Sequence, residues 1–174
     1  DLPTGWVGDW SEFYVNYKIY FYNPNLGFLL SEIAPGRGGF LGSIFYKSVD
    51  GGNNWTIQEL TYPLYDLVFF DRNTGFVSGG VSEWHGGHGD LFKTMDGGNS
   101  WINSFYSSFQ VKSMSFIDPQ TGFILSNQTR DGTNSNIHKT TNGGISWNEV
   151  YADKGDSVGL YFAGEEICFL NESV

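Results

Sequence analysis

Short runs in which apolar and polar residues alternate recur along the chain. Typical runs are Leu67 to Phe70, Gly75 to Ser78, Leu91 to Thr94 and Trp101 to Phe105. Alternation at every second residue predicts β-strands with one buried face, and helical periodicity is absent. Between the runs lie segments rich in Asp, Asn and Gly, such as Asp71 to Gly75, which favour turns. The pattern predicts an all-β protein built from short strands.

Two sequence elements recur in register. An octet that begins at Ser48 returns at Thr94 and Thr140, so both intervals are 46 residues (94 − 48 and 140 − 94). A second element precedes each octet, as Phe21 to Phe28, Phe69 to Phe76 and Phe116 to Phe123. A further copy begins at Tyr161-Phe162 and has Cys168 in the glycine position. Four strands per repeat at this period predict a β-propeller of four-stranded antiparallel blades, with three complete blades and part of a fourth.

The repeat predicts one propeller or half-propeller domain. We expect residues 1–18 to form N-terminal strands that are candidates to complete a blade. Blade 1 is expected over 19–66, blade 2 over 67–110, blade 3 over 111–157 and the start of blade 4 over 158–174.

The octet has a mechanical explanation. The carboxylate of Asp50 or Asp96 can accept N–H groups of its own turn, the second glycine can adopt a positive φ, and the tryptophan can lie between blades. Asn142 keeps the acceptor oxygen without the charge, which suits a turn better than a metal ligand or a general acid. We therefore predict a structural role for these positions: Ser48, Asp50, Gly52, Trp55, Thr94, Asp96, Gly98, Trp101, Thr140, Asn142, Gly144 and Trp147.

The octet pattern Ser/Thr-x-Asp-x-Gly-x-x-Trp resembles the Asp-box of BNR (bacterial neuraminidase) repeats, which occur in sialidases, sortilin-type receptors and related propellers. The version Asp-Gly-Gly-x-x-Trp, with Phe-x-Asp-x-x-x-Gly-Phe before it, is most similar to the photosystem II stability/assembly factor-like group. The resemblance covers residues 19–170. It implies a propeller fold but no single activity, because such boxes occur in enzymes and non-enzymes alike.

Propellers of this kind usually close six to eight blades, so the chain supplies about half a ring. Three explanations remain open: a fragment of a longer protein, a small ring of four blades, or a homodimer that completes a ring. An open half-ring exposes strand edges and an apolar face, so we expect either closure or a partner.

Charge and composition narrow the partners. Nine Lys and Arg against 19 Asp and Glu give a formal net charge of −10, which argues against nucleic acid and anionic membrane surfaces. No run of 18 apolar residues is present, so no membrane insertion is expected. The single Cys168 cannot form a disulfide within the chain. We expect a secreted, periplasmic or cell-surface protein.

Variable loops are the candidate ligand-binding regions, because binding groups concentrate in loops on a regular scaffold. The irregular segments are 32–42, 79–89 and 127–136. The second of them offers two imidazoles and nearby carboxylates that can hold a polar ligand or a divalent metal. The candidate residues are Arg37, Trp84, His85, His88, Asp90, Arg130 and Asp131. His138 is expected to be a half-buried packing residue.

These features favour a non-catalytic binding or scaffold module for a protein or glycan partner, without a cofactor. A fragment of a glycosidase-like or sialidase-like propeller enzyme is the alternative, and its candidate carboxylates are Glu32, Glu83 and Asp90. An assembly factor for a membrane complex is a third reading, which the resemblance alone implies. Phosphate loops, dinucleotide fingerprints and a Gly-x-Ser-x-Gly elbow are absent from the sequence, and no catalytic residue is assigned.

Overall fold

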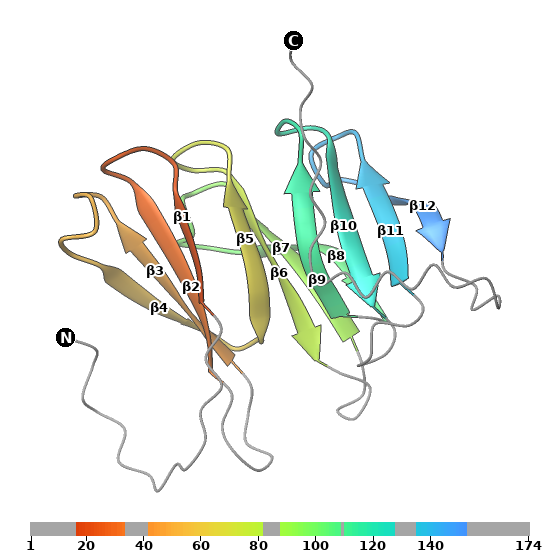
Figure 1. Cartoon of the computed structure of the whole chain (residues 1–174), viewed down its shortest axis with the longest axis horizontal. Helices are drawn as coiled ribbons and strands as arrows, with labels where there is room; N and C mark the ends of the chain where they lie inside the picture. The colour runs from red at the N-terminus through yellow and green to blue at the C-terminus, as the bar shows by residue number, and fades with distance from the viewer. Residues whose placement is uncertain (1–16, 34–41, 82–87, 109, 128–134, 153–174) are drawn as a thin grey trace, which may run out of the picture.

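The computed structural model describes residues 17–33, 42–81, 88–108, 110–127 and 135–152, and the structural statements below refer to these residues. They form 12 β-strands and no helix. The strands make three four-stranded antiparallel sheets, which lie side by side in chain order (Figure 1). The predicted all-β class is confirmed. A helix able to cross a membrane is absent from this part of the chain.

In each sheet, every strand pairs with the next strand along the chain. Sheet 1 consists of β1 (Tyr17–Phe21), β2 (Gly27–Ile33), β3 (Gly42–Ser48) and β4 (Thr56–Leu60). Sheet 2 consists of β5 (Leu64–Phe69), β6 (Gly75–Val81), β7 (His88–Thr94) and β8 (Ile102–Ser107). Sheet 3 consists of β9 (Gln110–Phe116), β10 (Gly122–Asn127), β11 (Ser135–Thr140) and β12 (Asn148–Ala152).

Each sheet takes its strands from one copy of the sequence repeat. The Phe-to-Phe element joins the first and second strands, and the octet joins the third and fourth. The first strand of sheet 2 begins at Leu64, before the expected Leu67, because its pairing with β6 already starts with Leu64 opposite Gly79. The backbone N–H of Leu64 also donates to Ser43 Oγ of sheet 1 at 2.8 Å. Residues 158–174 lie outside the described residues, as does 1–18 apart from Tyr17 and Lys18, which begin β1.

The turn between the first two strands of each sheet is closed by an Asx side chain. In sheet 2, Asp71 Oδ1 accepts the backbone N–H groups of Asn73 at 2.6 Å and Thr74 at 2.8 Å. Asn23 of sheet 1 and Asp118 of sheet 3 accept two backbone N–H groups in the same way. The local sequence therefore determines where the first strand ends and the second begins.

Buried apolar side chains fill the two spaces between neighbouring sheets. Sheets 1 and 2 enclose one cluster, formed by Leu26, Phe28, Leu30, Phe45, Leu64, Leu67, Phe69 and Val77. Sheets 2 and 3 enclose another, formed by Phe76, Leu91, Val111, Met114 and Ile124. Burial of apolar surface at these two interfaces holds the sheets together, because apolar area removed from water is the main stabilising contribution.

A pair of phenylalanine rings lies at the centre of each interface. Phe28 of sheet 1 stacks on Phe69 of sheet 2, with ring centroids 3.6 Å apart, and Phe76 of sheet 2 stacks on Phe116 of sheet 3 at 4.9 Å. The close fit requires a glycine beneath the ring. A Cβ atom on Gly75 would lie 2.7 Å from Phe69 Cγ, which is too close for any side chain. The glycine that starts the second strand is therefore part of the sheet-to-sheet packing.

The octet forms a tight turn between the third and fourth strands. In sheet 2, Thr94 Oγ1 accepts the Gly98 N–H at 2.9 Å and donates to Asp96 Oδ1 at 2.8 Å. Asp96 also accepts the Ser100 hydroxyl at 2.6 Å and the Ser100 N–H at 2.9 Å. These bonds, led by the Ser100 hydroxyl and then its N–H, lower the pKa of Asp96 to about 2. Gly98 has a φ of 88°. The expected turn contacts are all present.

The third octet forms the same turn without a charge. Asn142 Oδ1 accepts the Thr140 hydroxyl and the Ser146 N–H, both at 3.0 Å. One bond has the opposite direction from its equivalent in sheet 2: Asn142 Nδ2 donates to Ser146 Oγ at 2.9 Å, whereas the Ser100 hydroxyl donates to Asp96. The turn therefore needs the acceptor oxygen and not the negative charge.

Two octet tryptophans contact the preceding sheet. Trp101 lies edge-on to Phe45 of sheet 1 with ring centroids 5.3 Å apart, and Trp147 lies edge-on to Phe105 of sheet 2 at 6.0 Å. Trp55 differs: its indole Nε1–H donates to the Gly52 carbonyl at 2.9 Å. The predicted position between sheets thus applies to the second and third octets.

Candidate functional site

The predicted ligand-binding residues fall, by sequence, in or beside the connections between the second and third strands of each sheet. The connections β2–β3, β6–β7 and β10–β11 lie opposite the octet turns, because consecutive strands are antiparallel. Five of the predicted residues lie outside the described residues: Arg37, Trp84, His85, Arg130 and Asp131. His88 and Asp90 are described, and both lie on β7 at this end of sheet 2. We call this region the β6–β7 end.

His88 and Asp90 form a close pair at the β6–β7 end. Residues two apart on a strand point to the same face, and His88 Nε2 lies 3.1 Å from Asp90 Oδ2. Asp90 is 4% exposed, and its Oδ1 accepts Asn103 Nδ2 at 3.2 Å. Oδ2 is buried and accepts no hydrogen bond, so its contact with His88 is an ion pair only when the imidazole is protonated. Burial raises the pKa of Asp90, against the opposing effects of His88 and Asn103.

An exposed aromatic ring adjoins this pair. Tyr106 on β8 is 66% exposed, and its ring is stacked on the His88 imidazole with centroids 6.0 Å apart and planes at 16°. Asp90 pairs with Tyr106 in the register of β7 and β8. The β6–β7 end therefore presents an aromatic surface beside a partly exposed imidazole, which lies against a buried carboxylate.

The pair interrupts the repeat. At the 46-residue spacing, the residues equivalent to Asp90 are Ile44 and Asn136 (90 − 46 and 90 + 46), and the residue equivalent to His88 in sheet 1 is Gly42. A buried carboxylate at one position of an otherwise regular scaffold points to a specific role, because burying a charged group is unfavourable. This departure from the repeat is visible in the sequence once the copies are aligned.

A second polar cluster adjoins the β6–β7 end, and the sequence analysis did not predict it. Tyr65 Oη donates to the Gly80 carbonyl at 2.7 Å, and Gln110 Nε2 donates to Tyr65 Oη at 3.2 Å and to Gly80 at 3.3 Å. The Lys112 ammonium lies 4.5 Å from the Tyr65 ring centroid. These contacts join the end of β6 to the start of β9. They fix the sheet end that carries His88, and no repeated motif marks them in the sequence.

Asp66, also missed by the sequence analysis, links all three sheets. Its carboxylate lies on β5 of sheet 2, is 6% exposed and accepts the backbone N–H of Met114 in sheet 3 at 3.0 Å. It also lies 3.3 Å from Lys18 Nζ of sheet 1. Burial raises the pKa of Asp66, and the Met114 N–H and Lys18 oppose that shift. Its partners lie 48 residues away on both sides (66 − 18 and 114 − 66), so the role is structural and long-range.

We expect Asp66→Asn to change how stability depends on pH. Because the folded pKa of Asp66 is raised, its contribution is complete below the unfolded pKa of about 3.9 and is lost as the pH rises through the folded pKa. The wild type should therefore lose stability relative to Asp66→Asn as the pH rises above about 4. Urea unfolding of both proteins from about pH 4 upward measures their free energies of unfolding. A wild type that keeps or gains stability relative to Asp66→Asn as the pH rises would contradict the assignment.

His138 is half-buried against sheet 2, as expected of a packing residue. Its ring lies 5.0 Å from the Phe105 ring, and its buried Nδ1 makes no hydrogen bond. Burial lowers the pKa of His138, against the effect of Glu149, whose Oε2 lies 3.9 Å from Nε2. In the described ranges, no group of three or more His, Cys, Asp or Glu side chains could hold a metal ion.

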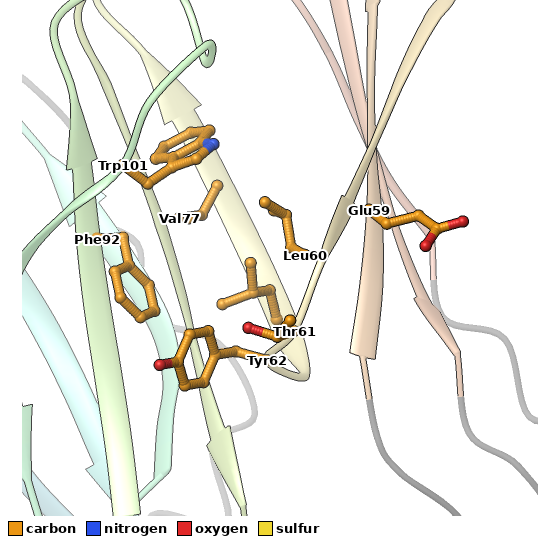
Figure 2. A pocket seen from close by; sticks show the side chains of 8 residues that line it. Glu59, Leu60, Thr61, Tyr62, Val77, Phe92 and Trp101 are labelled. Atoms are coloured by element: carbon orange, nitrogen blue, oxygen red, sulfur yellow. The ribbon is translucent and has the colours of Figure 1, made fainter.

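A pocket lies between sheets 1 and 2 and is lined in part by the octet residue Trp101. It measures about 170 Å³ and is mainly apolar, with Tyr62 and Phe92 in contact at a ring distance of 5.0 Å. Figure 2 shows Glu59 directed away from the other lining side chains, so the pocket holds no charge. It is a small gap in the sheet-to-sheet packing, and apart from Glu59 its polar side-chain lining is limited to Thr61, Tyr62 and Trp101.

No protein-family model matches this sequence, and none of the curated proteins is significantly similar to it. The functional argument therefore depends on the geometry alone.

Proposed function

We propose that the three sheets are blades of a β-propeller and that the protein is a non-catalytic binding module. Each four-stranded sheet packs against the next through the same stacked phenylalanine pair, which supports a regular rotation from blade to blade. The octet turns are stabilised by their own hydrogen bonds, so the repeated polar groups at this end of every sheet are used within the turn itself. The opposite end is where the sheets differ and where a ligand can be recognised.

The proposed ligand is a glycan, bound at the β6–β7 end. Glycan sites combine an exposed aromatic ring, against which a sugar ring packs, with polar groups that bond its hydroxyls. Tyr106 supplies an exposed ring, and His88 supplies a polar group beside it. Buried Asp90 lies against His88, with Oδ2 3.1 Å from Nε2. The stacking of exposed Tyr106 on His88, which lies against buried Asp90, is the observation that carries this proposal.

A glycan array followed by calorimetric titration of the best ligand tests the proposal. Tyr106→Ala should weaken binding by at least about tenfold, because an aromatic anchor at the centre of a contact contributes most of its affinity. Ile102→Ala is the matched control, since Ile102 is 60% exposed on the same strand but lies at the octet end. Binding to a protein partner with no binding to any glycan on the array would contradict the glycan class. Unchanged glycan binding by Tyr106→Ala would contradict the site.

A glycosidase-like activity is the second candidate, and one observation favours it. The raised pKa of buried Asp90 is the property that a general acid needs. Hydrolysis of a panel of chromogenic glycosides by the wild type and Asp90→Asn separates the two functions. We expect no turnover by either protein. Turnover by the wild type that is lost in Asp90→Asn would show that the protein is an enzyme and not a binding module.

A further inference from the structure

The pocket between sheets 1 and 2 lies on the same face of sheet 2 as the His88–Asp90 pair. Side chains on a strand alternate between its two faces, and β7 pairs with β6 without a bulge, so His88, Asp90 and Phe92 point to one side. Phe92 packs against the cluster between sheets 1 and 2, whereas Leu91 belongs to the cluster between sheets 2 and 3. The side with His88 and Asp90 therefore faces sheet 1, where Phe92 lines the pocket.

An exposed tyrosine lies against each end of this row of side chains. Tyr106, which is 66% exposed, is stacked on His88 with centroids 6.0 Å apart. Tyr62, which is 42% exposed, lies 5.0 Å from Phe92 (Figure 2). His88 and Phe92 are four residues apart (92 − 88), which corresponds to about 13 Å along a strand. One sugar ring is shorter than this distance, so a ligand that contacts both tyrosines has more than one sugar.

Polar side chains lie between the two ring pairs. Asn103 of β8 is exposed and opposite Phe92 in the register, and its Nδ2 donates to Asp90 Oδ1 at 3.2 Å. Asp90 in turn lies against His88. Aromatic rings with polar groups between them are the combination that sugar recognition needs. We call the surface formed by these side chains the aromatic strip: Tyr62, His88, Asp90, Phe92, Asn103 and Tyr106.

The pocket at the Tyr62 end of the aromatic strip has room for one ring. It measures about 170 Å³, and a protein cavity of about 150 Å³ admits benzene. Its lining combines apolar Leu60, Val77 and Phe92 with the hydroxyls of Thr61 and Tyr62. A sugar ring has the same two kinds of surface, because its C–H groups are apolar and its hydroxyls are polar.

Charge at the aromatic strip favours an uncharged ligand. Among the described residues, neither the strip nor the pocket lining includes Lys or Arg. Glu59 is directed away from the other lining side chains (Figure 2). An anionic sugar would find no cation here except a protonated His88, on a chain whose formal net charge is −10.

We propose that the ligand is an uncharged, linear oligosaccharide that runs along the aromatic strip. One sugar packs on Tyr106, another enters the pocket beside Tyr62, and His88 and Asn103 bond hydroxyls between them. This inference rests on the proposed glycan function and deepens it, because it makes the pocket a second subsite and specifies a ligand of more than one sugar.

A glycan array that carries single sugars, neutral linear oligosaccharides and anionic glycans is the first test. We expect the protein to be retained on neutral oligosaccharides. Retention on anionic glycans alone or on single sugars alone would overturn the uncharged oligosaccharide, while the glycan function would stand. Retention on no glycan would overturn both.

The dependence of affinity on chain length tests the second subsite with the wild type alone. Calorimetric titration uses the retained oligosaccharide and the same glycan shortened one sugar at a time. We expect the affinity to fall by at least about tenfold between the oligosaccharide and the single sugar, because the contact with Tyr62 is lost. Equal affinities would overturn the second subsite and leave the Tyr106 site in place.

Tyr62→Ala should weaken oligosaccharide binding by at least about tenfold and leave single-sugar binding unchanged, whereas Tyr106→Ala should weaken both. Tyr22→Ala is the matched control for Tyr62→Ala, because Tyr22 is 44% exposed but lies in the β1–β2 turn. The control should bind both ligands as the wild type does. Unchanged oligosaccharide binding by Tyr62→Ala would overturn the second subsite.

Discussion

Replacing Phe69 with alanine should destabilise the protein by about 3–5 kcal/mol. The ring is 1% exposed, stacks on Phe28 at 3.6 Å and lies edge-on to Trp101, so its loss leaves a cavity at the centre of the interface between sheets 1 and 2. Neighbouring strands cannot collapse into the space without breaking their hydrogen-bonded register. Chemical denaturation with a fluorescence readout measures the change.

Phe21→Ala is the matched control, because Phe21 occupies the equivalent position in sheet 1 but is 42% exposed. In dilute protein we expect it to cost about 1 kcal/mol or less. Equal effects of the two substitutions would mean that the phenylalanines do not stabilise the protein through contacts between sheets.

Gly98→Ala should destabilise the protein by about 2 kcal/mol or more. Two causes act together at this position. The φ of 88° is unfavourable for any residue with a Cβ, and that Cβ would lie 2.7 Å from Cζ of buried Phe45 in sheet 1. Thermal and urea unfolding of the variant measure the combined effect.

Gly52→Ala separates the two causes. Gly52 has the same φ of 88°, but its Cβ would lie 3.5 Å from the nearest atom, in Trp55 of its own sheet. This variant should show the backbone cost alone, about 1–2 kcal/mol. The remaining difference from Gly98→Ala reports the contact between sheets 1 and 2, and the absence of a difference would contradict that assignment.

The sequence was sufficient to predict the local structure. Turns such as the one at Asp71 and the octet at Asp96 are closed by bonds between residues at most four apart, so a short motif contains all the partners that it needs. Repetition of these motifs at a constant interval then predicted the grouping of strands into four-stranded units, as the three sheets show.

Contacts between sheets were less accessible from the sequence. Asp66 finds its partners in Lys18 and Met114, which belong to different repeats, and nothing local to Asp66 indicates that it is buried. The His88–Asp90 pair was chosen for its chemistry, while the stacking of Tyr106 on His88 depends on the register of β7 and β8. Register and burial between strands are properties of the whole sheet, and composition does not specify them.

The arrangement of sheets in a row has a consequence for how the chain unfolds. The substantial contacts in the described ranges join sheet 1 to sheet 2 and sheet 2 to sheet 3. Among the described residues, sheet 2 thus has two supporting neighbours and each outer sheet has one, as in a linear array whose stability is a sum over adjacent units. Opening begins most easily at an outer sheet and reaches the middle last, so the protein has a gradient of local stability along its length rather than one uniform value.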